Sequence, residues 1–343
     1  MQKTSAARQR AASLVHLPPL LLRHGVPLDA VLAETGVAAS DLAPDRFIDY
    51  AAYLQILENA ARLTACSDIG LQLGQCQTLA SLGPLGKVMR CASHLGEAMA
   101  DFAAFQISNS TGAAVYMHRV GDEVSWGYGI HDPASRASPY IHDVVLAVGR
   151  NFVAELTQGA VTVMEFNTMR PAPQDPAPWR AALGARIRFG QEQTCLYLSR
   201  ADTAFRLPSA DPAARSAALG ELAALLRFAP WGWTGRTRHA LPSLLLEGRS
   251  KMPEAARQLG LHPRTLRRAL EREGSSFETI KEDVRQVIAR ELLFLTDLQI
   301  SDLAMSLDFA SPSAFIHAFR RWTGATPAAW RNHQRETPER HQA

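Results

Sequence analysis

The stretch Ala256-Arg-Gln-Leu-Gly-Leu-His-Pro-Arg-Thr-Leu-Arg-Arg-Ala-Leu270 is followed, 48 residues further along the chain, by the similar stretch Ala304-Met-Ser-Leu-Asp-Phe-Ala-Ser-Pro-Ser-Ala-Phe-Ile-His-Ala-Phe319. Each copy begins with an alanine and a leucine three positions later, passes a point of chain reversal, and ends on a second set of apolar residues. This order predicts a short helix, a tight turn and a second helix. A helix-turn-helix has this layout, and its second helix enters the major groove of DNA. We therefore expect two tandem units, at about 253–272 and 302–321.

The first copy carries the local signals of both helices. Pro253 and Pro263 suit first helical turns, where the missing N–H is not needed, and Gly260 suits the reversal because glycine adopts positive φ without strain. Leu266 and Leu270 share one buried face, which leaves the arginines on the exposed faces. Arginines in a groove suit phosphates and guanine edges, although ordinary solvated surface is the alternative. The expected DNA contacts are His262, Arg264, Thr265, Arg267 and Arg268.

The second copy differs at the turn and on its exposed face. Asp308 replaces the turn glycine, and aspartate tolerates left-handed backbone better than most residues. Phe309, Phe315 and Phe319 predict a bulkier core. Because its exposed face is less basic, we expect this unit to contact the DNA backbone or to add a weaker sequence preference. The expected contacts are Ser311, Pro312, Ser313, His317 and Arg321.

The segment between the copies, about 277–296, contains no Gly or Pro. Its apolar residues recur at intervals of three and four, the period of an amphipathic helix. They are Ile280, Val284, Val287, Ile288, Leu292 and Leu295. One long helix would hold the two recognition helices at a set distance, so that they enter successive major grooves roughly 34 Å apart.

Residues 315–331 follow the run Phe-x-x-x-Phe-Arg-x-x-x-Gly-x-Thr-Pro-x-x-Trp-Arg. This run resembles the AraC/XylS family of bacterial transcription regulators, and the resemblance covers about 235–335. It implies two helix-turn-helix units on a linking helix, with double-stranded DNA as partner. By motif position, it implies contacts from Arg264, Arg267 and Arg268 in the first recognition helix. In the second recognition helix it implies contacts from Pro312, Ser313 and His317.

The N-terminal part changes texture along its length. Helical spacing over 11–105 gives way to strands at 113–118 and 124–130, a helix at 144–156 and strands at 161–166 and 195–198. This predicts an α+β domain with a small sheet. The expected fold class is mainly α: an α+β domain at 1–208, a linker at 209–234 and an all-α domain of tandem helix-turn-helix units at 235–335. A flexible tail at 336–343 completes it. The helix predicted at 213–228 could be a linker or a dimer contact.

The N-terminal part resembles the arabinose-binding-like domain of one branch of the same family. The segments that carry the resemblance are Gly83-Pro-Leu-Gly86, Arg188-Phe-Gly190, and Leu207-Pro208 with Ala210-Asp-Pro212. It implies a domain that senses a small molecule and biases the protein between DNA-binding and non-binding forms. The leading helices differ from a sugar-binding β-barrel, so the domain name does not identify arabinose as the effector.

Candidate effector-binding residues lie on the second strand and after it. Trp126 and Tyr128 could line a pocket, or could be ordinary core aromatics. His131, Tyr140, His142 and Asp143 form a polar cluster that could anchor a ligand or cap a loop.

The distribution of charge and the spacing of the cysteines further restrict the expected partners and the location of the protein. Residues 235–343 carry 17 Arg and Lys against 13 Asp and Glu, whereas the preceding part carries 19 against 20, so the positive balance lies with the predicted DNA-binding units. The cysteines at positions 66, 76, 91 and 195 lack zinc-site spacing and are expected to be reduced core residues. No apolar run is long enough for a membrane span, and the N-terminal apolar stretch is too short for a secretion signal. A cytoplasmic protein without metal, cofactor or membrane partner is expected.

The expected function is sequence-specific transcriptional regulation, as an activator, in response to a small metabolite. RNA polymerase and a second copy of the chain are further expected partners. One alternative is an effector-independent or architectural DNA binder, but the large apolar N-terminal domain argues against it because non-specific binding needs mainly charge. A fusion to a DNA-repair alkyltransferase is a remote alternative, since no cysteine has the context of its nucleophile. No catalytic motif occurs, so no enzyme is expected.

Overall fold

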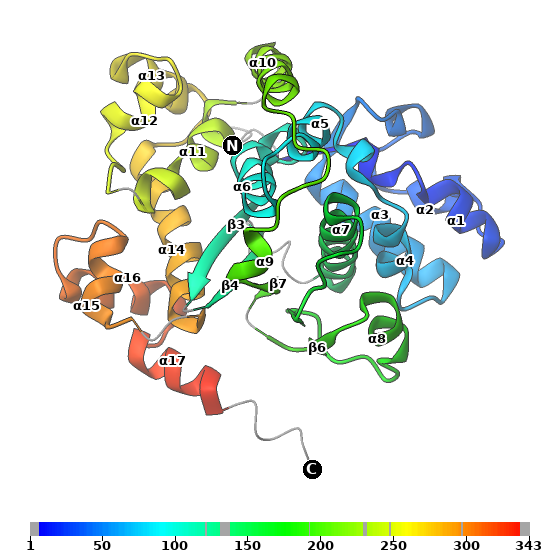
Figure 1. The fold of residues 1–343 in the computed structure, drawn as a ribbon. Coiled ribbons are helices and arrows are strands. Elements are labelled where there is room, and N and C mark those ends of the chain that lie inside the picture. Colours follow the sequence, from blue (N-terminus) through cyan, green and yellow to red (C-terminus); the bar gives the residue numbers. More distant parts are fainter. Residues whose placement is uncertain are drawn as a thin grey trace. The chain divides into compact units, whose positions relative to one another are not determined.

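The computed structural model describes residues 7–120, 122–130, 138–191, 193–228, 232–246, 248–295 and 298–336. The chain divides into two compact units, one of residues 6–230 and one that contains residues 231–343. The first unit is α+β and the second is helical (Figure 1). The expected fold class is thereby confirmed. The tail predicted at 336–343 lies, beyond Glu336, outside the described residues.

Short helices make up the first part of the N-terminal unit. They are η1 (Ala11–Leu14), α1 (Leu17–Arg23), α2 (Leu28–Leu32), η2 (Ala39–Leu42), α3 (Tyr50–Thr64), α4 (Ile69–Gln75), η3 (Leu79–Leu82), α5 (Pro84–Arg90), α6 (Leu95–Phe105) and η4 (Gln106–Ser108). Two strands, β1 (Arg8–Arg10) and β2 (Phe47–Asp49), pair antiparallel among them. The expectation of helices alone over 11–105 was therefore wrong at β2, because three residues are too few to show an alternating pattern.

The described residues of the N-terminal unit also form a five-stranded sheet. Its strands are β3 (Ala113–Val120), β4 (Glu123–Ile130), β5 (Glu165–Asn167), β6 (Arg186–Arg188) and β7 (Thr194–Ser199), in the order β3-β4-β7-β5-β6. Among the described strands of this sheet, β5 and β6 pair parallel and the other neighbours pair antiparallel. The strand expected at 161–166 forms only at β5, and β6 was not predicted. Strand β4 lies between two strands and both its faces are covered, so the neighbouring residues Ser125 and Trp126 are both buried.

Helix α7 (Pro139–Thr157) packs on β7 and is flanked by α3 and α4. It is longer than the helix predicted at 144–156. Two glycines of α4 allow this helix to approach closely. A Cβ at Gly70 would lie 2.4 Å from the Tyr140 carbonyl oxygen, and a Cβ at Gly74 would lie 2.5 Å from that of Val144. Any side chain at either position would push the two helices apart.

Three further helices belong to the N-terminal unit: α8 (Ala177–Leu183), α9 (Arg200–Thr203) and α10 (Pro212–Phe228). Helix α10 packs on α5, and its Ala218 and Leu222 are buried in the core of this unit. Arg215 of α10 also binds the Asp101 carboxylate of α6 with two hydrogen bonds, of 3.0 and 2.6 Å. Most of the stretch that was expected to link the domains, 209–234, thus packs as part of the N-terminal unit.

Seven helices form the described part of the C-terminal unit: α11 (Trp233–Leu246), α12 (Met252–Gln258), α13 (Pro263–Arg272), α14 (Phe277–Leu295), α15 (Ile300–Ser306), α16 (Pro312–Thr323) and α17 (Pro327–Glu336). Their apolar residues make one continuous core that runs from α11 to α16. Helix α14 contributes Phe277, Ile280, Val284 and Ile288 to this core. The predicted linking helix at 277–296 is confirmed as α14, which packs against α11, α15, α16 and α17.

Candidate nucleic-acid interface and internal cavity

The second helix of the first helix-turn-helix unit, α13, has one buried and one exposed face. Leu266 and Leu270 are 0% and 1% exposed, as the sequence predicted. Arg264, Arg267 and Arg268 are exposed and lie at intervals of three and four on the opposite side of the helix. Among the described residues, the ion pairs of the C-terminal unit involve other arginines and Lys281. The three guanidinium groups are therefore available to an anionic partner.

The start of α13 is held by its own residues. Gly260 has a φ of 69° in the turn from α12, as the sequence predicted. The His262 side chain caps the helix, since its Nδ1 accepts a hydrogen bond of 3.3 Å from the backbone N–H of Arg264. His262 and Thr265 are both exposed at this end of the helix. The N-terminal end of α13 and its arginine-bearing face are therefore both exposed.

The corresponding helix of the second unit, α16, is built on larger apolar residues. Phe315 and Phe319 are both fully buried, and their ring centroids lie 5.8 Å apart. The side chain of Ser311 caps the helix, accepting a 3.1 Å hydrogen bond from the backbone N–H of Ala314. The other predicted contact residues of this helix start, Pro312, Ser313 and His317, are exposed. This face carries hydroxyl, imidazole and ring groups instead of guanidinium groups.

The last turn of α16 contains two arginines with different surroundings. The predicted contact residue Arg321 forms an ion pair with Glu282 of α14. Glu282 also accepts a 2.9 Å hydrogen bond from the Trp322 indole, and these bonds from Trp322 and Arg321 lower the pKa of Glu282. Arg320 is exposed and was not among the predicted contacts. Its position seven residues after Ser313 would have placed it on the same helix face as that serine.

The turn between α15 and α16 is tied to other parts of the unit. Asp308 has a φ of 57°, so the predicted left-handed turn without glycine is confirmed. Its Oδ2 accepts hydrogen bonds of 2.6 Å from both the Ser250 hydroxyl and the Lys281 ammonium group. Partial burial raises the pKa of Asp308, but these hydrogen bonds and the nearby charges of Lys281 and Arg285 lower it by more, so it stays below its ordinary value.

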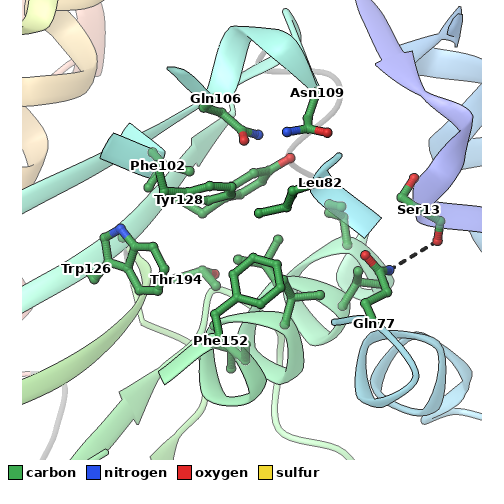
Figure 2. A pocket seen from close by; sticks show the side chains of 18 of the residues that line it. Ser13, Gln77, Leu82, Phe102, Gln106, Asn109, Trp126, Tyr128, Phe152 and Thr194 are labelled. Atoms are coloured by element: carbon green, nitrogen blue, oxygen red, sulfur yellow. Dashed lines mark hydrogen bonds between the residues drawn. The ribbon is translucent and has the colours of Figure 1, made fainter. Parts of the chain in front are cut away.

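The N-terminal unit contains a cavity of about 100 Å³. It lies between the sheet and α7, and the two predicted effector-binding residues, Trp126 and Tyr128, both line it (Figure 2). Phe102 and Phe152 add two more aromatic rings to its wall. The T-shaped contacts of Phe102 with Trp126 and with Phe152, at 5.5 and 5.7 Å, hold these rings in place. Both predicted aromatics are also core residues, so the two interpretations of the sequence do not exclude each other.

Polar groups lie at one end of the cavity, around the Tyr128 hydroxyl (Figure 2). That hydroxyl is 2.9 Å from the Tyr50 hydroxyl, and burial raises the pKa of Tyr128. Gln106 is buried beside it, and its Oε1 has no hydrogen-bond partner among the described residues. Gln77 also lines the cavity and donates a 3.1 Å hydrogen bond to the Ser13 carbonyl. Sequence patterns did not single out Gln106, because a lone glutamine after a helix has no distinctive signal.

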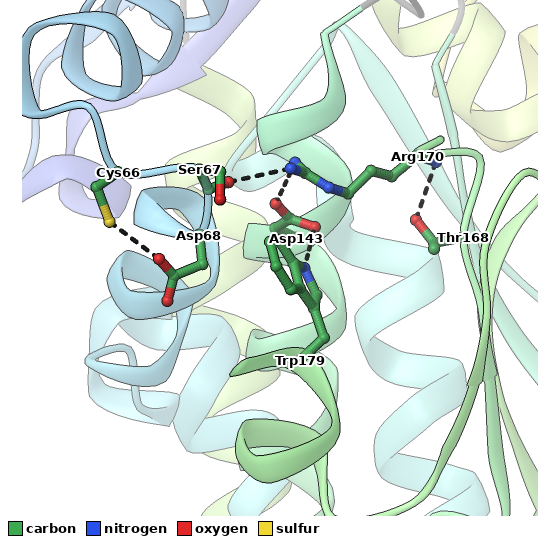
Figure 3. Close-up of polar contacts among 7 residues, drawn as sticks. All are labelled: Cys66, Ser67, Asp68, Asp143, Thr168, Arg170 and Trp179. Atoms are coloured by element: carbon green, nitrogen blue, oxygen red, sulfur yellow. Dashed lines mark hydrogen bonds and ion pairs between the residues drawn. The ribbon is translucent and has the colours of Figure 1, made fainter. Parts of the chain in front are cut away.

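The polar cluster predicted from Tyr140, His142 and Asp143 belongs to α7 and not to a loop. Figure 3 shows the contacts of Asp143. Asp143 is fully buried and pairs with Arg170 at 2.7 Å, while the Trp179 indole donates to its other oxygen at 2.8 Å. His142 lies 2.7 Å from the Thr194 hydroxyl. The loop-cap interpretation is thereby wrong, and the cluster ties α7 to the sheet and α8. His131 lies outside the described residues.

The cysteines and potential metal ligands are dispersed. Cys195 is buried, but the cysteines at 66, 76 and 91 are only partly buried, so the expectation of four core cysteines was wrong for three of them. Over the described part of the chain, His, Cys, Asp and Glu side chains do not gather in groups that could hold a metal ion. The helices described there also lack the combination of length and apolarity that crossing a bilayer requires.

Comparison with known proteins adds independent information. The profile of the "Arabinose-binding domain of AraC transcription regulator, N-term" matches residues 25–207, and that of a "Helix-turn-helix domain" matches residues 255–333. The HTH-type transcriptional regulator VirS of Mycobacterium tuberculosis is 26% identical over 84% of this chain and 85% of its own length. The ornithine utilization regulator of Pseudomonas aeruginosa is 26% identical over 91% of this chain and 93% of its own length.

A solved structure, that of the transcriptional regulator CdpR from Pseudomonas aeruginosa, aligns with 91% of this chain and 98% of its own at 23% identity and a TM-score of 0.44. The first of the two profiles alone covers more than half of the chain, and the second covers both helix-turn-helix units. The chain therefore belongs to the AraC family of DNA-binding transcription regulators, with an arabinose-binding-like domain ahead of its tandem helix-turn-helix units.

Proposed function

We propose that this regulator recognises a two-part DNA site chiefly through α13, activates transcription there, and is controlled by a small uncharged molecule bound in the N-terminal cavity. The observation that carries the DNA part is the face of α13, where Arg264, Arg267 and Arg268 are exposed opposite two buried leucines. Guanidinium groups placed in this way can bind guanine O6 and N7 in the major groove, as well as phosphates.

The second unit supplies the other half of the site. Both units share one apolar core with α14, so they engage DNA as a single body. Ser313 and His317 can each make one hydrogen bond to a base or phosphate, whereas Arg320 adds a positive charge. We therefore assign α16 a smaller part in base recognition and a larger part in positioning.

A mobility-shift titration with the DNA upstream of the protein's own gene tests the DNA part. The proposal predicts a specific complex at about 100 mM salt that survives excess competitor DNA, with protection of two adjacent segments in footprinting. Binding that competitor DNA removes completely would contradict it. An architectural binder would give that second result, because its affinity comes from phosphate contacts alone.

The chemistry of the cavity supports an uncharged effector. Arg10 is the one charged residue among those that line it, and its guanidinium already binds the Asp45 carboxylate at 2.6 Å and the Ser81 carbonyl at 3.1 Å. The rest of the wall is aromatic, aliphatic or neutral polar. A charged ligand would lose its hydration without gaining an opposite charge, and such a loss is costly. A mostly apolar ligand with one hydrogen-bond donor would satisfy the Oε1 of Gln106.

Fluorine NMR with three matched probes tests the effector part on the full-length protein. The probes are 4-fluorophenol, 4-fluorobenzoate and 4-fluorobenzylammonium, which share a ring and differ in charge. We expect line broadening for the phenol alone, its loss in Val148→Phe, which fills the cavity, and weaker broadening in Gln106→Leu. Equal binding of the benzoate or the ammonium probe would contradict the uncharged class. If no probe binds and xenon also fails to shift signals from the cavity wall, the cavity is not a binding site.

Two further measurements test whether the protein activates transcription and whether it forms a dimer. In a purified transcription assay with RNA polymerase, an activator raises transcript yield from the bound promoter, and a repressor lowers it. We propose a homodimer formed by the N-terminal unit, since two copies double the length of DNA contacted. Light scattering should give twice the 37.5 kDa mass of the chain, and the monomer mass would contradict the dimer.

A further inference from the structure

The turn of the second helix-turn-helix unit uses an unfavourable residue for its backbone. Asp308 has a φ of 57°, a conformation that costs energy for any residue with a Cβ, whereas the equivalent turn of the first unit uses Gly260 at 69°. Strain of this kind persists where surrounding contacts hold the residue in place. The contacts of Asp308 show which parts of the unit do so.

Two other segments contact the Asp308 side chain. Ser250 donates from the segment that leads into α12, at 2.6 Å, and it is fully buried. Lys281 donates from α14, also at 2.6 Å, and its side chain is only 9% exposed. The guanidinium of Arg285, one turn further along α14, lies 3.5 Å from the same carboxylate oxygen.

Arg285 also holds the backbone of the turn. Its Nε donates a 2.7 Å hydrogen bond to the Leu307 carbonyl, and its terminal nitrogen donates to the Asp308 carbonyl. Its guanidinium carbon lies 4.5 Å from the centre of the Phe309 ring. The turn is therefore bound to α14 through both its backbone and its carboxylate.

We propose that Asp308, with Ser250 and Lys281, is a positioning device that sets the orientation of the second recognition helix relative to the first, and thereby the half-site spacing that the protein accepts. Arg285 and Glu282 of α14 also make polar contacts with the second unit, but the rest of the joint between the units is apolar packing, which has no preferred direction. Hydrogen bonds require specific distances and angles, so a buried polar contact can select one arrangement among several that pack equally well. Ser250 belongs to the approach to the first unit and Asp308 to the turn of the second, so their contact spans both.

The test compares half-site spacing in the native protein and in the double variant Asp308→Gly/Lys281→Met. Glycine adopts the positive φ without strain, and methionine leaves no buried ammonium group without a partner. A DNA site is first selected from a random library with the native protein. The two half-sites are then moved apart or together one base pair at a time. Each site is titrated by mobility shift, and the half-site bound by α13 is also titrated alone.

The native protein should prefer one spacing by about tenfold or more over its neighbours. The double variant should bind the isolated α13 half-site within about twofold of the native protein, while its preference among spacings falls below about threefold. Asp302→Asn, which changes an exposed carboxylate of α15 outside this contact, should retain the native preference.

Two results would overturn the proposal. One is a folded double variant that keeps the full spacing preference, which would show that the contact of Asp308 with Ser250 and Lys281 does not set the orientation. The other is an equal loss of affinity for the isolated α13 half-site, which would show that the contact serves the fold as a whole.

Discussion

The two helix-turn-helix units of this regulator are alike in their buried halves and different in their exposed halves. Leu266 and Leu270 of α13 and Phe315 and Phe319 of α16 occupy corresponding places, and all are at most 1% exposed. The exposed side of α13 carries three arginines, whereas that of α16 carries Ser313 and His317. The shared core constrains only the buried half, so the exposed halves are free to take different parts in DNA recognition.

The largest expected effect is a loss of stability, caused by substitutions in the buried core that both helix-turn-helix units share. Phe315→Ala should lower the free energy of unfolding by about 3–5 kcal/mol and Leu266→Ala by about 2–5 kcal/mol, because each leaves a cavity in the same core. Urea denaturation followed by circular dichroism measures both. Since the core is continuous, each variant should shift one common transition of the C-terminal unit. Unfolding of one helix-turn-helix unit while the other stays folded would contradict a single continuous core.

A smaller loss of stability is expected from a substitution in the turn of the first helix-turn-helix unit. At Gly260 an added Cβ would meet no atom within 4 Å, so Gly260→Ala tests the backbone conformation alone. The positive φ should cost about 1–2 kcal/mol, measured as a shift of the urea midpoint. Gly220, which also has free space but lies in α10 without a positive φ, is the matched control, and Gly220→Ala should be neutral or slightly stabilising. An unchanged midpoint in Gly260→Ala would contradict the strain argument.

The other turn predicts a pH dependence. The pKa of Asp308 is lower in the folded protein than in the unfolded chain. Its stabilising contribution is therefore complete at pH values above the ordinary aspartate pKa, and it is lost as the pH falls through the lower, folded-state value. Unfolding free energies measured between pH 6 and pH 3 should decline less steeply in Asp308→Asn than in the native protein. Identical slopes of unfolding free energy against pH would show that Asp308 does not contribute to the loss of stability at low pH.

The smallest expected effect separates phosphate contacts from base contacts. If Arg320 contacts a phosphate, Arg320→Ala should reduce the slope of log affinity against log salt concentration by about 1. It should also weaken binding to all DNA sequences by a similar factor. Mobility shifts at several salt concentrations measure this. A loss confined to one sequence would instead assign Arg320 to base recognition and would narrow the difference between the two units.

The C-terminal unit could be predicted well because its signals are local. Apolar spacing, the turn residues Gly260 and Asp308, and the absence of Gly and Pro over 277–295 each act within a few residues of where they occur. The sequence could not predict that Arg321 would be engaged by Glu282, since that contact joins residues 39 positions apart. For the same reason the link from Asp308 to Ser250 was not foreseen.

The N-terminal unit was predicted less completely. The alternation of Trp126 and Tyr128 along β4 could be seen, and both line the cavity. The short strands β2 and β6 were missed because three residues show no period, and their pairing depends on distant partners. The sequence predicts that Asp143 anchors a ligand or caps a loop, whereas its burial beside Arg170 makes it a structural link within the unit. Desolvation raises the pKa of Asp143 to about 7 and outweighs the opposing effect of Arg170.

The most direct test of the difference between the units is a comparison of two double variants on the same specific DNA site at one salt concentration. We predict that Arg267→Ala/Arg268→Ala lowers specific affinity at least 30-fold, roughly the effect of two lost base contacts, while Ser313→Ala/His317→Ala lowers it less than fivefold. Arg23→Ala/Arg150→Ala removes the same charge from the exposed surface of the N-terminal unit and should leave affinity nearly unchanged. Equal losses in the first two variants, or a greater loss in the second, would contradict the assignment of base recognition to α13.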